Sequence, residues 1–408
     1  MAKWRRNLYL LFAVQVLSVA GFSLVFPFLP LYVAELGVAT RGSVAFWSGL
    51  VFSSQGVTMM LSSPLWGSVA DRYGRKPMLV RATIGGALMV VLMGLAQNAE
   101  QLVLIRTAQG LLTGVVSATS ALVAATVPKE KSGESLGLIQ TGTWVGVAVG
   151  PLIGGLVSEA FGYRASFWLT GAVLALAGVA VIFCVKEEFE PPPQRDRVNF
   201  WEDYRKLLRT PDMPSLYGVS FLQSLGRSVT MPVMAFFFVG LLATSEGAAA
   251  YTGLSMGAKA AVGSVSAIFL GRLSDRVGHE KILVAGAVVA VLFYLPQAFV
   301  VQAWQLLCLQ ALTGISAGAI MPATGALLNM RTAQGSHGAT FGLSNSVNAG
   351  GRMVAPLLGA TLFPLIGMKG VFGITAVVYA ALAFVALYIW RKSISSAPIR
   401  PVPRAAGD

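Results

Sequence analysis

Long apolar segments alternate with short polar ones along the whole chain. Twelve segments of about 20 residues or more carry few charges and are long enough to cross a bilayer as helices. They cover approximately residues 7–32, 44–69, 77–96, 102–127, 137–158, 164–185, 214–240, 249–270, 282–301, 304–329, 339–363 and 368–390. Strands of a membrane barrel would be about ten residues long with alternating polarity, which is not the pattern here. The sequence therefore predicts an all-α integral membrane protein with twelve transmembrane helices.

A charged turn occurs twice, at equivalent places in the two halves of the chain. GSVADRYGRK begins at Gly67, and GRLSDRVGHEK begins 204 positions later at Gly271. The same offset, within one residue, relates Pro27 to Pro232, Gly110 to Gly314, Gly114 to Gly318, and Pro151 to Pro356. We therefore predict two six-helix pseudo-repeats, at residues 1–185 and 214–391, joined by a cytoplasmic linker at 186–213 and followed by a cytoplasmic tail at 392–408. Duplicated architecture of this kind usually binds a substrate between its repeats.

The composition and the distribution of charge agree with a membrane protein. Hydrophobic residues make up 55% of the chain and charged residues 12%, about half the charged fraction of a soluble domain. Most of the 30 Lys and Arg fall in the loops on one side of the predicted membrane, which places that side, and both termini, in the cytoplasm. The net charge of +13 then reflects topology and attraction to anionic lipid. We expect a monomeric multi-pass protein of the bacterial inner membrane that does not bind nucleic acid.

Residue types needed for cofactor or enzyme chemistry are scarce. The two cysteines, Cys184 and Cys308, fall in different predicted spans, and His279 and His337 fall in predicted loops. This spacing favours neither a disulfide nor a metal site. The sequence contains no phosphate-binding G-x-x-x-x-G-K-[ST] loop. We expect no cofactor and no enzymatic activity.

Three motifs combine charged or polar residues with glycine. In the first turn, Gly67 permits close helix packing, Gly74 permits a tight turn, and Asp71 stands among cations at a helix end. This charged turn comprises Gly67, Asp71, Arg72, Gly74, Arg75 and Lys76, with Asp275 and Arg276 in the second copy. The second motif, LIRTAQGLLTG in span four, contains Arg106. A guanidinium inside a membrane span either has a function or extends to the headgroups. The third is the set of glycines in span five, at Gly137, Gly146, Gly150-Pro151 and Gly154-Gly155.

With these motifs the chain resembles the twelve-span drug/proton antiporters of the major facilitator superfamily, among them the bacterial multidrug-resistance proteins. The resemblance covers nearly the whole chain. It implies that the residues of the charged turn form a gating motif, in which Asp71 latches the outward-facing state by a contact near the start of span eleven. It further implies that Arg106 takes part in proton transfer. It also implies that the span-five motif, with Gly146, Gly150, Pro151, Gly154 and Gly155, distinguishes this chain as an exporter.

The predicted interior of the second half is basic. Arg227, Lys259 and Arg352 lie within spans, whereas none of the 17 acidic residues is at mid-span. These cations either line a central cavity and favour anionic substrates, or pair with backbone carbonyls and lipid phosphate. The other cavity candidates are polar or aromatic residues within spans: Phe26, Gln55, Gln140, Gln223 and Asn345. We assign proton coupling to Glu35, Asp71 and Arg106.

The sequence thus predicts proton-driven export of small amphipathic or anionic toxic compounds by alternating access. The alternative is a proton symporter or exchanger for organic anions, because a basic cavity would serve uptake equally well. The expected partners are a small-molecule substrate, protons and membrane lipid.

Overall fold

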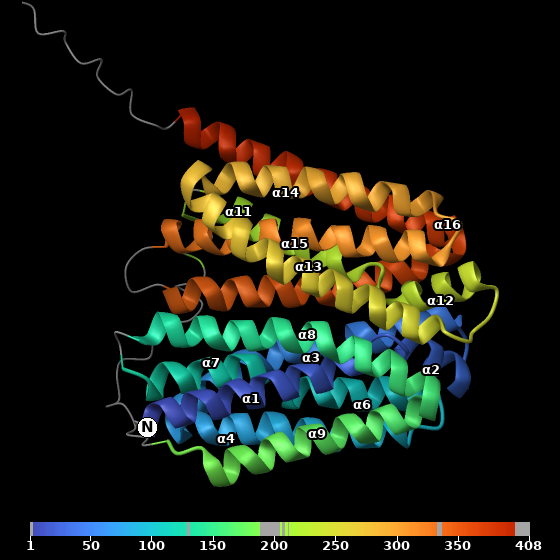
Figure 1. Ribbon diagram of the computed structural model, residues 1–408, viewed down its shortest axis with the longest axis horizontal. Coiled ribbons are helices and arrows are strands. Elements are labelled where there is room, and N and C mark those ends of the chain that lie inside the picture. Colours follow the sequence, from blue (N-terminus) through green and yellow to red (C-terminus); the bar gives the residue numbers. More distant parts are fainter. Residues whose placement is uncertain are drawn as a thin grey trace, which may run out of the picture.

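Two bundles of helices lie side by side in the molecule (Figure 1). The computed structural model describes residues 3–128, 131–187, 205, 209–210, 212–332 and 337–395, and all regular structure in these ranges is helical. A bilayer requires this, because a helix satisfies its own backbone N–H and C=O groups where no water is present. The prediction of an all-α membrane protein is confirmed.

The first half of the chain forms one bundle and the second half forms the other. The first half contains α1 (Lys3–Leu24), α2 (Leu29–Leu36), α3 (Val44–Tyr73), α4 (Arg75–Val80), the π-helical turn η1 (Arg81–Gly85), α5 (Gly86–Gly94), α6 (Ala99–Leu112), α7 (Val115–Thr126), α8 (Ser132–Phe161) and α9 (Tyr163–Cys184). The second half contains α11 (Met213–Ser228), α12 (Met231–Leu242), α13 (Ala248–Val277), α14 (His279–Tyr294), the 3-10 helix η3 (Leu295–Phe299), α15 (Ala303–Arg331) and α16 (His337–Ser395).

Eleven helical stretches among the described residues are long and apolar enough to cross a membrane. The last of them belongs to α16, in which Gly367 is non-helical (φ 67°, ψ 177°) and joins two helices. The predicted total of twelve spans depends on counting these two helices separately. The predicted linker at 186–213 and tail at 392–408 lie mostly outside the described residues, so their boundaries stay predictions.

Proline interrupts the first span of each half at the same place. Pro27 lies between α1 and α2, and Pro232 lies at the start of α12, just after α11 has ended. Proline has no amide hydrogen and its ring clashes with the preceding turn, so a helix breaks or bends there. The internal repeat of the sequence therefore corresponds to a structural feature that occurs in both bundles, an interruption of the first span.

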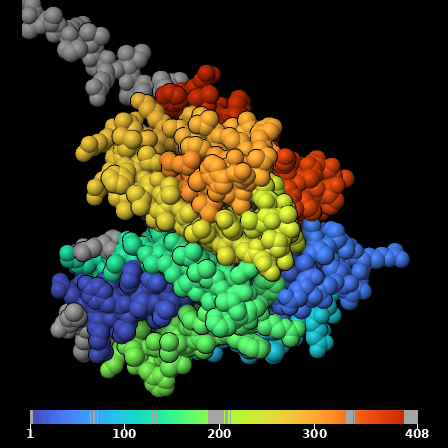
Figure 2. Space-filling view, turned by 45° about the vertical axis from the view of Figure 1, so that its right-hand side comes forward, coloured from blue at the N-terminus to red at the C-terminus, as the bar shows by residue number. Residues whose placement is uncertain are grey.

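The first described helix begins, and the last one ends, on the same side of the molecule. The start of α1 and the end of α16 share one end, here called the terminal end, and the opposite end is called the far end (Figure 1). The distribution of Lys and Arg predicts that the terminal end faces the cytoplasm. The two halves meet along a seam formed by α8 against α13 and α3 against α16, and Figure 2 shows the green and yellow segments in contact there.

Contacts across the seam are close at the far end. A Cβ built on Gly155 of α8 would lie 2.6 Å from the carbonyl oxygen of Ala249 in α13, and one built on Gly49 would lie 2.8 Å from that of Pro356. The backbone amide of Gly247 donates to the Glu159 carboxylate at 2.6 Å. Nearer the terminal end, positions such as Gly137 have nothing within 4 Å of an added Cβ. Among the described residues, the halves therefore pack most closely at the far end.

An ionic cluster joins the start of α11 to α14, α15 and α16 at the terminal end of the second half. Asp212, just before α11, pairs with Arg331 and accepts a hydrogen bond from Lys392 at 2.6 Å. Arg331 also lies 3.8 Å from Glu280. The hydrogen bond from Lys392, assisted by the charge of Arg331 and opposed by burial, holds the pKa of Asp212 below its ordinary value.

We expect Asp212→Asn to reduce the free energy of unfolding by about 2 kcal/mol at pH 7, because charge-assisted hydrogen bonds are lost. Asparagine tolerates the left-handed backbone of this position (φ 67°), so the loss would report the charge alone. A carboxyl whose pKa is lowered by folding stabilises the protein above its unfolded pKa of about 4, and this contribution disappears as the pH falls through the lower folded value.

Thermal unfolding of the detergent-solubilised protein between pH 3 and pH 8 measures this effect. The difference between wild type and variant should be constant above about pH 5 and should shrink below about pH 4. A difference that did not depend on pH would show that the carboxylate charge is not the stabilising feature.

Candidate functional site

A polar cluster in the second half surrounds Lys259 of α13. The Lys259 ammonium donates to the Tyr294 hydroxyl of α14 at 2.7 Å and lies 3.5 Å from the Gln310 Oε1 of α15. Gln310 in turn donates to Gln297 at 2.9 Å. The Tyr294 ring stacks on that of Tyr379 in α16, with centroids 5.1 Å apart. Hydroxyl and amide oxygens thus receive the ammonium group in the interior of the second half.

The other two predicted cations lie beside this cluster. Arg227, in the last turn of α11, is exposed although it belongs to a membrane span, and Arg352 of α16 is half-buried. Arg227 acts electrostatically on both Lys259 and Arg352. None of the three forms an ion pair with a carboxylate in the part of the chain that the structure describes. Arg227 thus links the other two cations electrostatically.

Arg106 occupies the interior of the first half. Its side chain is 2% exposed, so it does not extend to the headgroups. Its Nη1 donates to the Gln109 Oε1 at 2.7 Å, and the guanidinium lies 5.8 Å from the centre of the Phe26 ring. The Arg106 Nε and the Gln109 Nε2 are buried without a hydrogen-bond partner. Burying a charge with an unsatisfied hydrogen-bond donor costs free energy, so the Arg106 side chain destabilises the folded protein.

The cations of the two halves occupy exchanged positions. The repeat offset of 204 residues relates Arg106 to Gln310 and Gln55 to Lys259. At these paired positions, the first half has a cation on α6 and a glutamine on α3. The second half has a cation on α13 and a glutamine on α15. The pairs occupy corresponding helix contacts, because Gly110 packs against the backbone of Gln55 and Gly314 against that of Lys259.

The remaining cavity and coupling candidates differ in exposure. Phe26, Gln55 and Gln223 are half-buried, whereas Gln140 of α8 and Asn345 of α16 are exposed. Glu35, near the end of α2, is also exposed and lies at the far end. The structure thus does not bring Glu35 to Arg106 or to the three cations of the second half.

The first charged turn is fixed by a residue that sequence reasoning missed. The Glu187 carboxylate accepts the backbone amides of Arg75 and Lys76, at 2.9 Å and 2.8 Å, and so caps the start of α4. Gly74 has φ 96°, as a tight turn requires, and Arg72 is exposed. Gly67 and the backbone of Asp71 belong to α3, but the Asp71 side chain lies outside the described part of the structure, so the predicted latch of Asp71 stays a prediction.

The second charged turn has a different arrangement. Asp275 is largely exposed and lies 4.0 Å from the His279 Nε2, and the His279 Nδ1 lies 2.6 Å from the Ser274 hydroxyl. Arg276 is exposed. Glu280, which stands where the first copy has Lys76, lies beside Arg331. The two turns share a glycine-containing shape but not their ionic partners.

The glycines of span five form two contact faces on α8. Gly146, Gly150 and Gly154 pack against α1, where an added Cβ would overlap the backbone near Ala20 and Leu24. Gly155 faces the other way and packs against α13. Pro151 lies within the same helix, and its carbonyl oxygen packs against Gly253. The helix is therefore both part of the first bundle and part of the seam.

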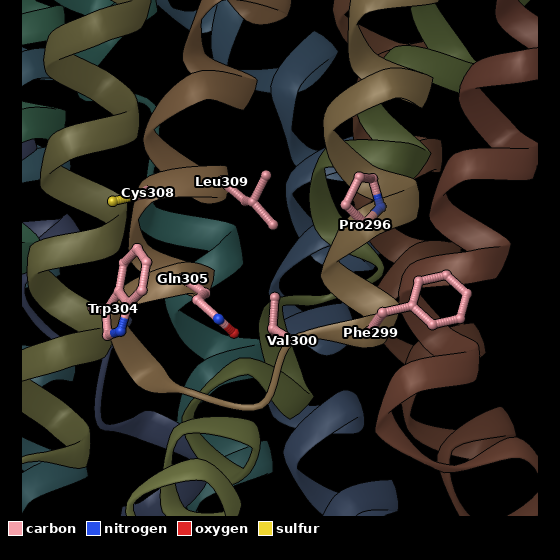
Figure 3. Close-up of a pocket in the computed structure, with 7 residues that line it drawn as sticks. All are labelled: Pro296, Phe299, Val300, Trp304, Gln305, Cys308 and Leu309. Atoms are coloured by element: carbon pink, nitrogen blue, oxygen red, sulfur yellow. The ribbon is translucent and has the colours of Figure 1, made fainter.

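A surface pocket at the far end is not a candidate for this site. It lies where η3 leads into α15, and Figure 3 shows its lining residues: Pro296, Phe299, Val300, Trp304, Gln305, Cys308 and Leu309. The one polar side chain that could bind a ligand strongly is that of Gln305, which already accepts the amides of Val301 and Gln302. The pocket is otherwise apolar, and we expect it to contact lipid.

Comparison with known families agrees with the internal repeat. The family model of the Major Facilitator Superfamily matches the chain twice, at residues 11–244 and 216–406. Multidrug resistance protein MdtG of Escherichia fergusonii is 36% identical over 389 residues, covering 95% of each chain. The protein of the same name from Enterobacter lignolyticus is 35% identical over 402 residues, covering 98% of this chain and 96% of that one.

Solved structures of transporters share the fold. A bacterial homologue of the human lysosomal transporter Spinster, in an inward-facing and unoccupied conformation, gives a TM-score of 0.80 at 15% identity and covers 97% of this chain and 98% of that chain. The human organic anion transporter MFSD10 (TETRAN) gives 0.71 at 17% identity, covering 95% of this chain and 100% of that chain. At these identities the likeness shows the fold alone.

The resemblance drawn from the sequence motifs, including that to the multidrug-resistance proteins, is confirmed. From its duplicated helical bundles, its family match and its bacterial relatives, the chain belongs to the major facilitator superfamily, as a multi-pass transporter of the bacterial inner membrane rather than an enzyme.

Proposed function

We propose that this transporter exports small amphipathic or anionic toxic compounds by alternating access, driven by protons. The observation that carries the proposal is the grouping of Arg227, Lys259 and Arg352 without a carboxylate partner among the described residues. A cavity with this charge attracts an anionic group and disfavours a cationic one. The exposure of Arg227 within a span supports its access to a substrate.

Two further observations support export. The relatives that are 36% identical are multidrug resistance proteins. In addition, the span-five glycines, which the family resemblance associates with exporters, make backbone contacts both within the first half and across the seam. The close packing between the halves at the far end supports a cycle in which the cavity opens to one side at a time.

Proton coupling is assigned to the first half, with Arg106 as its central residue. The side chain is buried, charged and without a carboxylate partner in the described part of the chain, so a nearby change in protonation would alter its free energy strongly. Glu35 and Asp71 are the carboxylates that we assign to carry the proton, and neither lies at mid-span.

The test uses two naphthalene compounds of the same size, a sulfonate and a trimethylammonium, whose charges do not change with pH. Inverted membrane vesicles whose lumen is acidified by respiration should accumulate the sulfonate. The Arg227→Ala, Lys259→Ala double variant should accumulate at least about tenfold less sulfonate than wild type, because two positive charges proposed to attract the anion are removed. The double variant Arg272→Ala, Lys281→Ala is the matched control, since both of its residues are exposed and lie near the terminal end.

The direction of transport separates export from the second candidate, organic-anion uptake. A proton symporter would empty the acidified vesicles of sulfonate, and an exchanger would respond to a second anion and not to the pH gradient. Normal sulfonate export by the double variant would contradict the role of the cations.

A further inference from the structure

The fourth span of the first half is broken, whereas its counterpart in the second half is continuous. α6 ends at Leu112 and α7 begins at Val115, with Thr113 extended (ψ 171°) and Gly114 at φ 132°. The equivalent span, α15, runs without a break from Ala303 to Arg331. The repeat offset relates Gly114 to Gly318, so both helices have a glycine at this position.

The two glycines serve different purposes. A Cβ on Gly318 would lie 2.6 Å from the Gly263 carbonyl oxygen and 2.7 Å from the Ala267 amide nitrogen, so this glycine permits α15 to pack closely on α13. A Cβ on Gly114 would meet only Ser117 and Arg81, at 3.5 Å and 3.6 Å. Gly114 is thus needed for its positive φ and not for space.

The break leaves backbone carbonyls without their usual helical partners, and side chains of the first half donate hydrogen bonds to them. In a continuous helix the carbonyls of Gly110 and Leu111 would accept from the amides of residues 114 and 115. Here Gly110 accepts from the Ser62 hydroxyl at 3.2 Å, and Leu111 accepts from the Trp66 indole at 2.6 Å. Arg81 donates to the carbonyl of Thr113, inside the break, at 3.3 Å.

Trp66 and Arg81 also contact each other. The Arg81 guanidinium lies 3.8 Å from the centre of the Trp66 ring, a cation–π contact. Arg81 begins the π-helical turn η1, and its positive charge lies near the carbonyl end of α6, where a helix attracts cations. We call these two residues the clasp.

The second half lacks the clasp and lacks the break. At the repeat offset, Leu270 stands in place of Trp66 and Ala285 in place of Arg81. Neither side chain can donate a hydrogen bond to a carbonyl, and α15 is continuous. The presence of the clasp and the interruption of the helix therefore occur together in one half and are absent together in the other.

We propose that Trp66 and Arg81 are positioning residues that hold span four in its broken form, and that transport requires the clasp to release so that the span straightens. Arg106 is carried by α6, immediately before the break, so straightening would change its position relative to α7. The proposal rests on the proposed function only in assigning this motion to a transport cycle.

Spin labels across the break test the clasp directly. Cysteines are introduced by Leu104→Cys in α6 and Ala125→Cys in α7, at two exposed positions, after Cys184 and Cys308 have been replaced by serine. A continuous helix would separate the two labelled positions by about 32 Å. In each of the variants Gly114→Ala, Trp66→Phe and Arg81→Gln, the population with this label distance should increase relative to wild type. For Gly114→Ala the straight form should gain about fivefold in population, since alanine favours a helix over glycine by that factor.

Transport supplies the second readout. In the variants Gly114→Ala, Trp66→Phe and Arg81→Gln, the maximal rate of sulfonate export should fall at least about tenfold. KM should stay within about twofold, because the cations of the second half are unchanged. Arg81→Lys should restore part of the rate by restoring the charge. Gly325→Ala is the control, because Gly325 lies in the counterpart helix with nothing within 4 Å of an added Cβ.

Unchanged label distances in Trp66→Phe and Arg81→Gln would overturn the proposal, as would an effect confined to KM. The distances are measured without a substrate, so they test the clasp even if the sulfonate is not transported. If the wild-type protein did not export the sulfonate while the variants still shifted the label distances, the proposed function would be contradicted and the clasp would not.

Discussion

Gly154→Ala is expected to abolish transport and to reduce sharply the amount of folded protein in the membrane. A Cβ at this position would overlap the backbone carbonyl of Leu24 in α1. No side-chain rotation relieves such an overlap, so α1 and α8 would have to move apart along a contact that Gly146 and Gly150 also form. Overpacking of a close contact costs about 3 kcal/mol, which is a large part of the stability of a folded protein.

Thermal unfolding in detergent and the yield of monomeric protein measure this effect. Gly137→Ala is the matched control, because Gly137 lies in the same helix and nothing lies within 4 Å of an added Cβ. If Gly154→Ala folded and transported as wild type does, the close packing of α8 on α1 would not be essential.

The same helix shows how packing and motion are separated in this fold. Gly146, Gly150 and Gly154 recur every four residues and so share one face, which packs within the first half. Gly155 is one residue further on and faces α13 of the second half. The first face joins helices that move together, whereas the second meets a helix from which it must separate when the far end opens.

Much of this architecture could be predicted from the sequence because it depends on local chemistry. The sequence identified Pro27 and Pro232 as a repeated pair, and each lies at an interruption of the first span of its half, because proline disfavours a continuous helix. Glycines spaced by four in an apolar segment indicated a close helix contact. Cations in apolar segments without acids predicted a positive interior; Arg227 interacts electrostatically with both Lys259 and Arg352, and their role in a cavity stays a prediction.

The partners of these residues could not be predicted, because they come from distant segments. Tyr294 is 35 residues from Lys259, and in the sequence it is one of many aromatic residues within apolar spans. Glu187 caps a helix that begins 112 residues earlier in the chain, which no local pattern indicates. Gly114 and Gly318 look alike in the sequence, and only the packing around each distinguishes a helix break from a close contact.

Arg106→Gln is expected to leave the protein at least as stable as wild type and to reduce proton-driven sulfonate export at least about tenfold. The guanidinium is buried, its Nε has no partner, and no carboxylate pairs with it among the described residues. A charge in the interior of a membrane span costs about 3 kcal/mol, and the substitution removes that cost. Glutamine also keeps a donor for Gln109 and stands at the equivalent position of the second half, as Gln310. Selection would retain such a charge for function and not for stability.

Thermal unfolding and sulfonate accumulation in acidified inverted vesicles should therefore change in opposite directions, which distinguishes loss of coupling from loss of fold. Arg272→Gln serves as the control, since Arg272 is exposed near the terminal end and should alter neither quantity. The variant should also lose the dependence of accumulation on the pH gradient, because the proposed coupling residue would no longer carry a charge. A strongly destabilised Arg106→Gln protein whose folded fraction still followed the pH gradient would show that Arg106 is a structural residue and that protons are coupled elsewhere.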